Sequence, residues 1–307
     1  MELLESLAGQ LAQAVRIVNE REAREQERRQ KEAALLENAR VTRDLELAKQ
    51  IQLSLLPTAP PSLPGVSIAC RCIPASHVGG DYYDFFQRGD QLMDLVMADV
   101  SGHSVGAALI MVETRSVLRA QIQGTRSTGE ILQVLNQLLY EDLTRAELFI
   151  TMFCGKFDAV SRLLSYSNAG HTRPLLLRGG IWQELDAEGL ILGVEYQVGF
   201  EEKSVALEPG DLLFMYTDGI IEAEGQAGEL FGVERLCTLL YEMQRLGPEE
   251  IIEGVMARLA LFTSGEPLQD DVSMVVMKVE KNRTQGALAK SSQLLHNEVD
   301  LTTRRWP

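Results

Sequence analysis

The stretch that decides the fold is residues 81–99, DYYDFFQRGDQLMDLVMAD, in which two strand patterns flank the turn Arg88-Gly89-Asp90. The turn residues and the short spacing predict a β-hairpin, and hairpins build antiparallel sheets. The second strand of this pair is largely apolar, so we expect it to be buried. It ends in the carboxylate of Asp99. A carboxylate in that position is costly unless it is paired, hydrogen-bonded or bound to a metal.

Similar strand patterns recur along the chain and are interrupted by two pairs of helices. The sequence predicts helices over 105–123, 128–143, 232–245 and 248–263, the second opened by Ser127 and Thr128 with Glu130 close behind. Strands are expected at 66–70, 81–87, 92–99, 149–158, 163–168, 173–178, 181–185, 198–206, 211–217 and 272–280. Hairpin-linked strands with paired helices on the outer faces predict an α+β fold, a four-layer α/β/β/α sandwich.

A long helix is expected to precede this sandwich, because residues 1–56 contain no proline and no glycine after Gly9. Two seams of apolar spacing, three and four residues apart, are typical of a coiled coil. The first seam is Leu4, Leu7, Leu11, Ala14 and Val18, and the second is Val41, Leu45, Ala48, Gln52 and Leu55. We expect residues 1–56 to form a homodimeric, signal-transmitting coiled coil. The alternative is a solvated helix that lies on its own domain.

Prolines mark the boundary between the helix and the sandwich. Pro57 ends the helical pattern, and Pro60, Pro61 and Pro64 predict an extended linker. We therefore expect a catalytic domain over residues 57–281. The polar residues 282–307 show no clear period and are expected to be a mostly disordered tail.

The composition limits the classes of partner. A formal charge of −15 argues against nucleic acid and anionic membrane surfaces, which bind through Lys and Arg. No apolar run reaches the roughly 20 residues that span a bilayer. The N-terminus lacks the basic start of a signal peptide, and the four cysteines show no zinc spacing. The sequence predicts a cytoplasmic protein without membrane insertion.

Four short segments place aspartate beside glycine or other small residues at the ends of expected strands. They are residues 79–81 (GGD), 99–103 (DVSGH), 217–219 (TDG) and 270–273 (DDVS). Each alone is a plausible turn in which the aspartate accepts backbone N–H bonds. Together they supply oxygen ligands without the thiolates that select zinc, and such a set selects a hard ion, Mg²⁺ or Mn²⁺.

Five motifs resemble, in their order, those of the SpoIIE/RsbU-like branch of the PPM metal-dependent protein phosphatases. They are GGDYYDFF (79–86), MADVSGHSVGAAL (97–109), SNAGH (167–171), PGDLLFMYTDGIIEA (209–223) and DDVSMVV (270–276). The resemblance covers roughly residues 45–280. It implies an αββα sandwich that dephosphorylates phosphoserine or phosphothreonine with two Mn²⁺ or Mg²⁺ ions.

The resemblance also implies roles for the aspartates. Asp99 would bridge both metals and would be catalytic through the metal-bridged water, while the Val100 carbonyl would bind the second metal. Asp81 matches a ligand of that second metal, and Asp218 and Asp270 match ligands of the first. Two cations neutralise a phosphate dianion and activate water, so no protein nucleophile is expected.

Further residues are expected to support the site: Asp271, Gly80, Gly102, Asn168, His171 and Gly219. Among them, Asn168 is expected to shape a turn, and His171 to lie at the rim of the site or to hold a loop. His103 is a candidate general acid toward the leaving serine oxygen. Its alternative is a loop histidine that stabilises the turn.

The resemblance implies a substrate class as well, a phosphorylated serine on a small STAS-type anti-anti-sigma protein in partner-switching signalling. Two other functions stay open from the sequence. One is a pseudophosphatase, a catalytically inactive dimeric regulator. The other is a nucleotidyl cyclase, suggested by residues 79–81, although it leaves the TDG and DDVS motifs unexplained.

Overall fold

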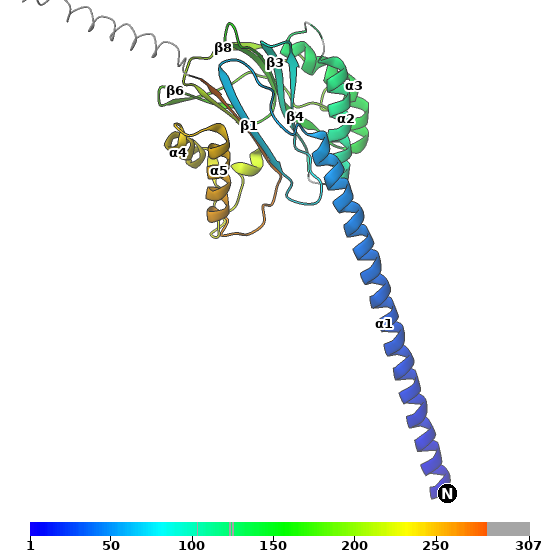
Figure 1. Ribbon diagram of the computed structural model, residues 1–307. Helices are drawn as coiled ribbons and strands as arrows, with labels where there is room; N and C mark the ends of the chain where they lie inside the picture. Colours follow the sequence, from blue (N-terminus) through cyan, green and yellow to red (C-terminus); the bar gives the residue numbers. More distant parts are fainter. Residues whose placement is uncertain (103, 123, 125, 281–307) are drawn as a thin grey trace, which may run out of the picture. The chain divides into compact units, whose positions relative to one another are not determined.

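The computed structural model describes residues 1–280 except 103, 123 and 125, so the predicted tail lies outside the described residues (Figure 1). In the described part, ten strands form two five-stranded sheets in which every pairing is antiparallel. The first sheet has the order β1 (Val66–Ile73), β10 (Val272–Val279), β9 (Leu212–Tyr216), β6 (Leu175–Arg178) and β7 (Ile181–Glu184). The second has the order β2 (Tyr82–Arg88), β3 (Leu92–Val100), β4 (Ile150–Asp158), β5 (Leu163–Ala169) and β8 (Lys203–Ala206).

Two helix pairs cover the outer faces of the sheets (Figure 1). Helices α2 (Val105–Gln121) and α3 (Thr128–Ala146) pack on the second sheet, and α4 (Gly232–Met243) and α5 (Pro248–Phe262) belong to the first. The predicted α+β class and the four-layer α/β/β/α arrangement are therefore confirmed. The start predicted for α3 is also confirmed, because Ser127 and Glu130 form a reciprocal capping box.

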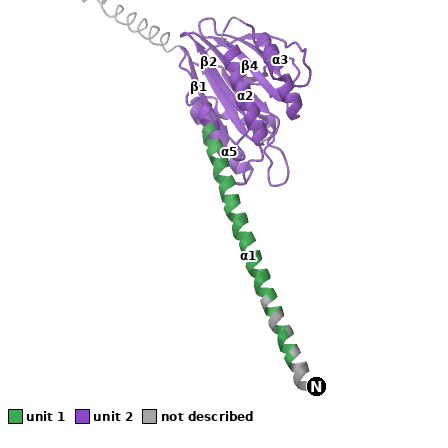
Figure 2. Ribbon diagram, turned by 90° about the vertical axis from the view of Figure 1, so that its right-hand side faces the viewer, with its two compact units in different colours: residues 1–51 green, residues 52–307 purple. Residues whose placement is uncertain are grey.

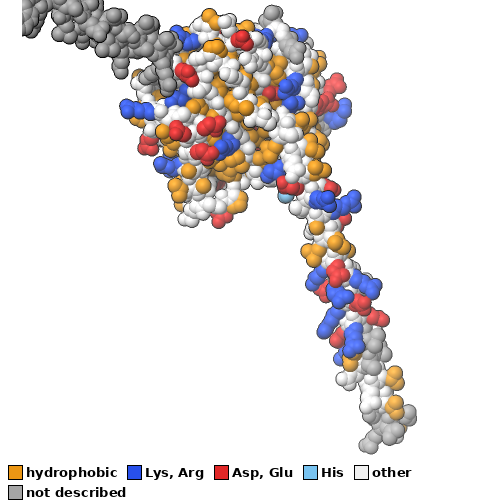
Figure 3. Space-filling view, viewed as in Figure 1, with side chains coloured by type: hydrophobic (Ala, Val, Ile, Leu, Met, Phe, Trp, Pro, Cys, Tyr) orange, Lys and Arg blue, Asp and Glu red, His pale blue; other side chains and the backbone are white. Residues whose placement is uncertain are grey.

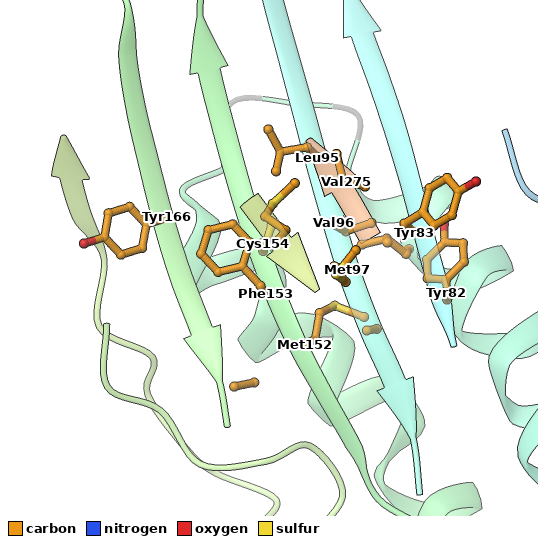
Figure 4. Close-up of a cluster of buried hydrophobic side chains, with 14 of the residues drawn as sticks. Tyr82, Tyr83, Leu95, Val96, Met97, Met152, Phe153, Cys154, Tyr166 and Val275 are labelled. Atoms are coloured by element: carbon orange, nitrogen blue, oxygen red, sulfur yellow. The ribbon is translucent and has the colours of Figure 1, made fainter. Parts of the chain in front are cut away.

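The period of two in a strand distributes apolar side chains between two cores. In β10, Val275 and Met277 belong to the core between the sheets, whereas Met274 and Val276 belong to the core under α4 and α5. Figure 4 shows Val275 beside side chains of β3 and β4 from the other sheet. A strand that is apolar on both faces is thus explained by cover on both sides.

One predicted strand is shorter than expected. We expected a strand over 198–206, but β8 covers only Lys203–Ala206. Upstream of it, the Glu201 N–H donates to the Glu188 carbonyl at 3.1 Å, and the Glu188 N–H donates to the Glu201 carboxylate at 2.9 Å. These bonds tie the segment to a loop, so it does not extend the ladder with β5.

Helix α1 (Glu2–Leu55) is continuous over 54 residues, so the prediction of a long N-terminal helix is confirmed. The chain divides into two compact units, residues 1–51 and the part from Gln52 onward (Figure 2). Charged side chains of both signs line α1 in Figure 3, and i,i+4 ion pairs form along it, among them Glu25–Arg29 at 2.9 Å and Glu27–Lys31 at 2.7 Å. None of the helices in the described ranges is both long and apolar enough to cross a membrane.

Candidate active site

Strand ends from both sheets supply the predicted carboxylates. Asp81 directly precedes β2, and Asp99 lies in β3 one residue before its end. In the other sheet, Asp218 opens a short 3-10 helix, η1 (Asp218–Ile220), after β9, and residues 270 and 271 directly precede β10. Because neighbouring strands are antiparallel, the start of one strand and the end of the next lie at the same end of each sheet.

Hydrogen bonds join the two sheets at this end of the strands. The Thr217 hydroxyl donates to Oδ2 of Asp81 at 2.8 Å. From the same sheet as Thr217, the Asp271 carboxylate accepts the Gly80 N–H at 2.8 Å and the Ala75 N–H at 2.8 Å. Asp271 therefore fixes the backbone that leads into Asp81.

Glycine is required where these segments approach one another. A Cβ on Gly80 would lie 2.3 Å from the Val100 carbonyl oxygen and 3.1 Å from Oδ1 of Asp99. A Cβ on Gly219 would lie 2.1 Å from the Asp271 carbonyl oxygen. Gly102 has a φ of 83°, a left-handed conformation that favours glycine. The three glycines predicted to support the site thus allow close backbone approach or a positive φ.

The carboxylates interact electrostatically as one group. Burial and, after it, the charges of Asp218, residues 270 and 271, and Glu222 together raise the pKa of Asp99 to about 8. Burial also raises the pKa of Asp81, with added contributions from Asp99 and Asp271. The charged groups that shift these two pKa values are all carboxylates. Their mutual repulsion is relieved by protons or by cations.

The donor set therefore fits hard divalent cations. Within the described ranges, no three His, Cys, Asp or Glu side chains are grouped closely enough to hold one ion by themselves. The site is thus an electrostatic cluster and not a closed shell of protein ligands. Mg²⁺ is usually bound by one or two carboxylates and keeps several waters, so this arrangement is compatible with Mg²⁺ coordination. The role of each carboxylate as a metal ligand stays a prediction.

Asn168 and His171 form a buried turn after β5. The Asn168 side chain donates to the His171 carbonyl at 3.0 Å and accepts the His171 N–H at 2.7 Å. His171 is 6% exposed, and its Nδ1 lies 2.8 Å from the hydroxyl of Thr151, which pairs with Asp99 across the sheet. Burial lowers the pKa of His171 to about 3, so the ring is neutral. Its contacts hold a loop one strand away from Asp99.

Three residues near the site were not singled out as site residues by the sequence: Thr217, Glu222 and Gln52. Glu222 raises the pKa values of Asp99 and Asp218, and its signal was its position four residues after Asp218 in TDGIIE. Gln52 and Thr217 are buried polar side chains whose partners are distant in sequence. His103, the candidate general acid, lies outside the described residues.

The two sheets between helix pairs, with carboxylates at one end of the strands, define a PP2C-type phosphatase fold. The solved SiaA-PP2C domain of Pseudomonas aeruginosa superposes with a TM-score of 0.69 over 78% of this chain and 98% of that domain, at 24% identity. The profile of the family described as Stage II sporulation protein E (SpoIIE) matches residues 89–280. The chain belongs to this family, and the predicted membership of the SpoIIE/RsbU-like branch is confirmed.

Curated relatives support the same placement. Protein IcfG of Synechocystis sp. is 31% identical over 262 residues, which cover 76% of this chain and 41% of IcfG. Phosphoserine phosphatase RsbU of Bacillus subtilis is 26% identical over 241 residues, which cover 76% of this chain and 70% of RsbU. The chain thus spans less than half the length of IcfG.

Proposed function

We propose that this chain is a metal-dependent protein phosphatase that hydrolyses phosphoserine or phosphothreonine in a protein substrate. The observation that carries the proposal is the group of carboxylates around Asp99, whose burial and mutual repulsion raise its pKa to about 8. Such a group favours bound cations, and cations are what a phosphate dianion requires. Membership of the SpoIIE family supports the reaction class.

The family resemblance favours two ions, Mn²⁺ or Mg²⁺, held by these residues. Asp99, Asp81 and the Val100 carbonyl would hold one ion, and Asp99, Asp218 and Asp270 the other. The last three carboxylates would have to draw together around the ion, because in the described part of the chain no three such side chains are grouped closely enough to hold one. When bound, the ions neutralise the phosphate and lower the pKa of a water. The protein holds the carboxylates in place and keeps Gly80 against the Val100 carbonyl, where a Cβ would lie 2.3 Å from the oxygen. No side chain is assigned as a nucleophile.

The substrate belongs to the same proposal. A small STAS-type anti-anti-sigma protein, phosphorylated on serine, is the partner that the family resemblance favours. The name of the relative RsbU, a phosphoserine phosphatase, supports the choice of serine. Phosphopeptide mass spectrometry of a deletion strain tests it, because the phosphosite of the substrate should accumulate. No change at any STAS phosphosite contradicts this choice of substrate.

The reaction is tested with purified protein on a phosphoprotein and on p-nitrophenyl phosphate, with and without Mn²⁺. Wild type should show turnover that needs the metal, and Asp99→Ala should show none. Absence of metal-dependent turnover on any phosphoprotein would instead favour a pseudophosphatase.

Residues 1–56 are proposed as the dimerisation and signal-transmitting segment. Several apolar side chains of the predicted seams of α1 are exposed in the single chain, among them Leu7 at 50%, Leu11 at 62% and Val41 at 47%. A second copy of the helix would bury them along the predicted seam. We place the protein in the cytoplasm, and its four free cysteines are consistent with a reducing compartment.

A further inference from the structure

The hydroxyl of Thr217 connects the two sheets at the carboxylate cluster. Thr217 is fully buried, and Asp81 is 4% exposed. The hydroxyl lies 2.8 Å from Oδ2 of Asp81, which precedes the first strand of the other sheet. A buried carboxylate needs such donors, because an unpaired charge is expensive to bury.

The direction of this bond follows from the backbone of β10. The Thr217 N–H donates to the Ser273 carbonyl at 3.1 Å, and the Ser273 N–H donates to the Thr217 hydroxyl oxygen at 2.9 Å. An N–H group can only donate, so the hydroxyl accepts there and keeps its single proton for another acceptor. The short contact to Asp81 uses that proton, whereas the Ser273 carbonyl lies at 3.5 Å from the hydroxyl.

Thr217 is therefore held by one sheet while it holds a carboxylate of the other. The next residue along the chain is Asp218, which is assigned to the other proposed ion. We infer that Thr217 is a positioning residue: its hydroxyl fixes the orientation of Asp81 and the spacing between Asp81 and Asp218, and with them the geometry of the metal site. This inference rests on the proposed function, because it assigns Thr217 to the proposed metal site.

Thr217→Val tests it, because valine keeps the shape of threonine and removes the hydroxyl. Mn²⁺ binding is measured by isothermal titration calorimetry, and the Mn²⁺ concentration for half-maximal turnover is measured beside it. Loss of a group that orients a metal ligand typically costs 10–100-fold in metal affinity. We expect about that loss of affinity in Thr217→Val. Thr217→Ser, which keeps the hydroxyl, should remain close to wild type.

Thr114→Val is the matched control. Thr114 is also fully buried, and its hydroxyl has no hydrogen-bond partner in the part of the chain that is described. The same substitution there should leave Mn²⁺ affinity unchanged. Thermal unfolding in EDTA verifies that each variant is folded, and Thr217→Ala replaces Thr217→Val if the latter is not.

The outcomes separate this inference from the proposed function. Wild-type affinity in Thr217→Val, or a Thr217→Ser variant as defective as Thr217→Val, overturns the role of Thr217 alone. Wild-type protein that binds Mn²⁺ but hydrolyses no phosphoprotein overturns the phosphatase and leaves the role of Thr217 standing. Wild-type protein that binds no Mn²⁺ overturns both.

Discussion

The side-chain amide of Gln52 forms two hydrogen bonds with the backbone of one residue, Gly79. Its Nε2 donates to the Gly79 carbonyl at 2.7 Å, and its Oε1 accepts the Gly79 N–H at 3.0 Å. Gly79 lies two residues before Asp81 in the segment that approaches the carboxylate cluster. The last turn of α1 is held further by Arg115, whose Nε donates to the Leu55 carbonyl at 2.9 Å. The end of the helix is thus bonded to the backbone beside the site.

Gln52→Ala should weaken both folding and metal use. It leaves the N–H and carbonyl of Gly79 without these partners, and buried unpaired groups cost about 1–3 kcal/mol. We expect a lower midpoint in urea unfolding and a higher Mn²⁺ requirement for turnover. Gln50→Ala, at an exposed position of the same helix, is the control. Equal behaviour of the two variants would show that the bonds to Gly79 do not support the site.

Gly80→Ala should disrupt the site more than the addition of a single methyl group would suggest. The added Cβ would lie 2.3 Å from the Val100 carbonyl oxygen, and backbone atoms must move to make room. We expect metal-dependent turnover to fall at least tenfold, about the scale of a misplaced ligand. Gly199→Ala is the matched control, because nothing lies within 4 Å of its Cβ position. Similar turnover in both variants would contradict the close approach of Gly80.

Asp99→Asn should stabilise the metal-free protein at pH 8 while removing its response to Mn²⁺. The pKa of Asp99 is about 8 in the folded state and near 3.8 in the unfolded state, so the folded state holds the extra proton between these values. The unfolding free energy of wild type in EDTA therefore falls as pH rises toward 8, by about 1.4 kcal/mol per pH unit from this group. Asparagine removes this dependence.

Thermal unfolding in EDTA and in Mn²⁺, at pH 6 and pH 8, measures both effects. Asp90→Asn, in the exposed β2–β3 turn, should leave both as in wild type. If Mn²⁺ still raised the melting temperature of Asp99→Asn as in wild type, Asp99 would not be the bridging ligand.

His171 should make the protein sensitive to acid. Burial lowers its pKa from 6.5 to about 3. Between these two pH values the unfolded chain binds a proton on His171 and the folded state does not. Its contribution to the unfolding free energy is complete above pH 6.5 and is lost as pH falls toward 3, by about 1.4 kcal/mol per pH unit. His171→Gln should flatten urea-unfolding profiles between pH 4 and 6. His77→Gln is the control, and an equal slope in both variants would exclude His171 as the source.

Leu11→Glu should convert the proposed dimer to a monomer. Leu11 belongs to the predicted seam of α1 and is 62% exposed in the single chain. A charge at a seam position is buried without a partner in a parallel coiled coil. Sedimentation equilibrium should give the mass of one chain for Leu11→Glu and of two for wild type. Gln13→Glu, exposed on the same helix and outside the seam, should remain dimeric. A monomeric wild type would contradict the proposed coiled coil.

Local structure could be predicted from the sequence more completely than the pairing of strands in the sheets. Hairpins such as β2–β3 follow from a turn between two strand patterns, and the capping box of Ser127 and Glu130 marks the start of α3. The placement of β10 between β1 and β9 joins segments almost 200 residues apart, and no local signal specifies it. The short β8 also depended on a distant loop, through the bonds between Glu188 and Glu201.

The same difference holds for the residues of the site, some of which could be predicted from the sequence and some not. Each aspartate alone could be an ordinary turn residue, but the four segments that carry them, taken together, predicted a metal site. Thr217 and Gln52 are ordinary polar residues, and only their partners reveal their importance. Asp81 lies 136 residues from Thr217, and Gly79 lies 27 residues from Gln52. Such pairings are a property of the folded chain.

The segment between β1 and β2 passes from one sheet to the other and carries Gly79, Gly80 and Asp81. Apart from the bond between Val100 and Gly80, its described bonds run largely to side chains, those of Gln52, Asp271 and Thr217. A displacement of this segment would leave the ladders of both sheets intact. Each side-chain bond contributes only about 1 kcal/mol net. The position of Asp81 thus depends on a few individual side chains and not on the ladder of either sheet, so a single substitution can displace it while every strand stays paired.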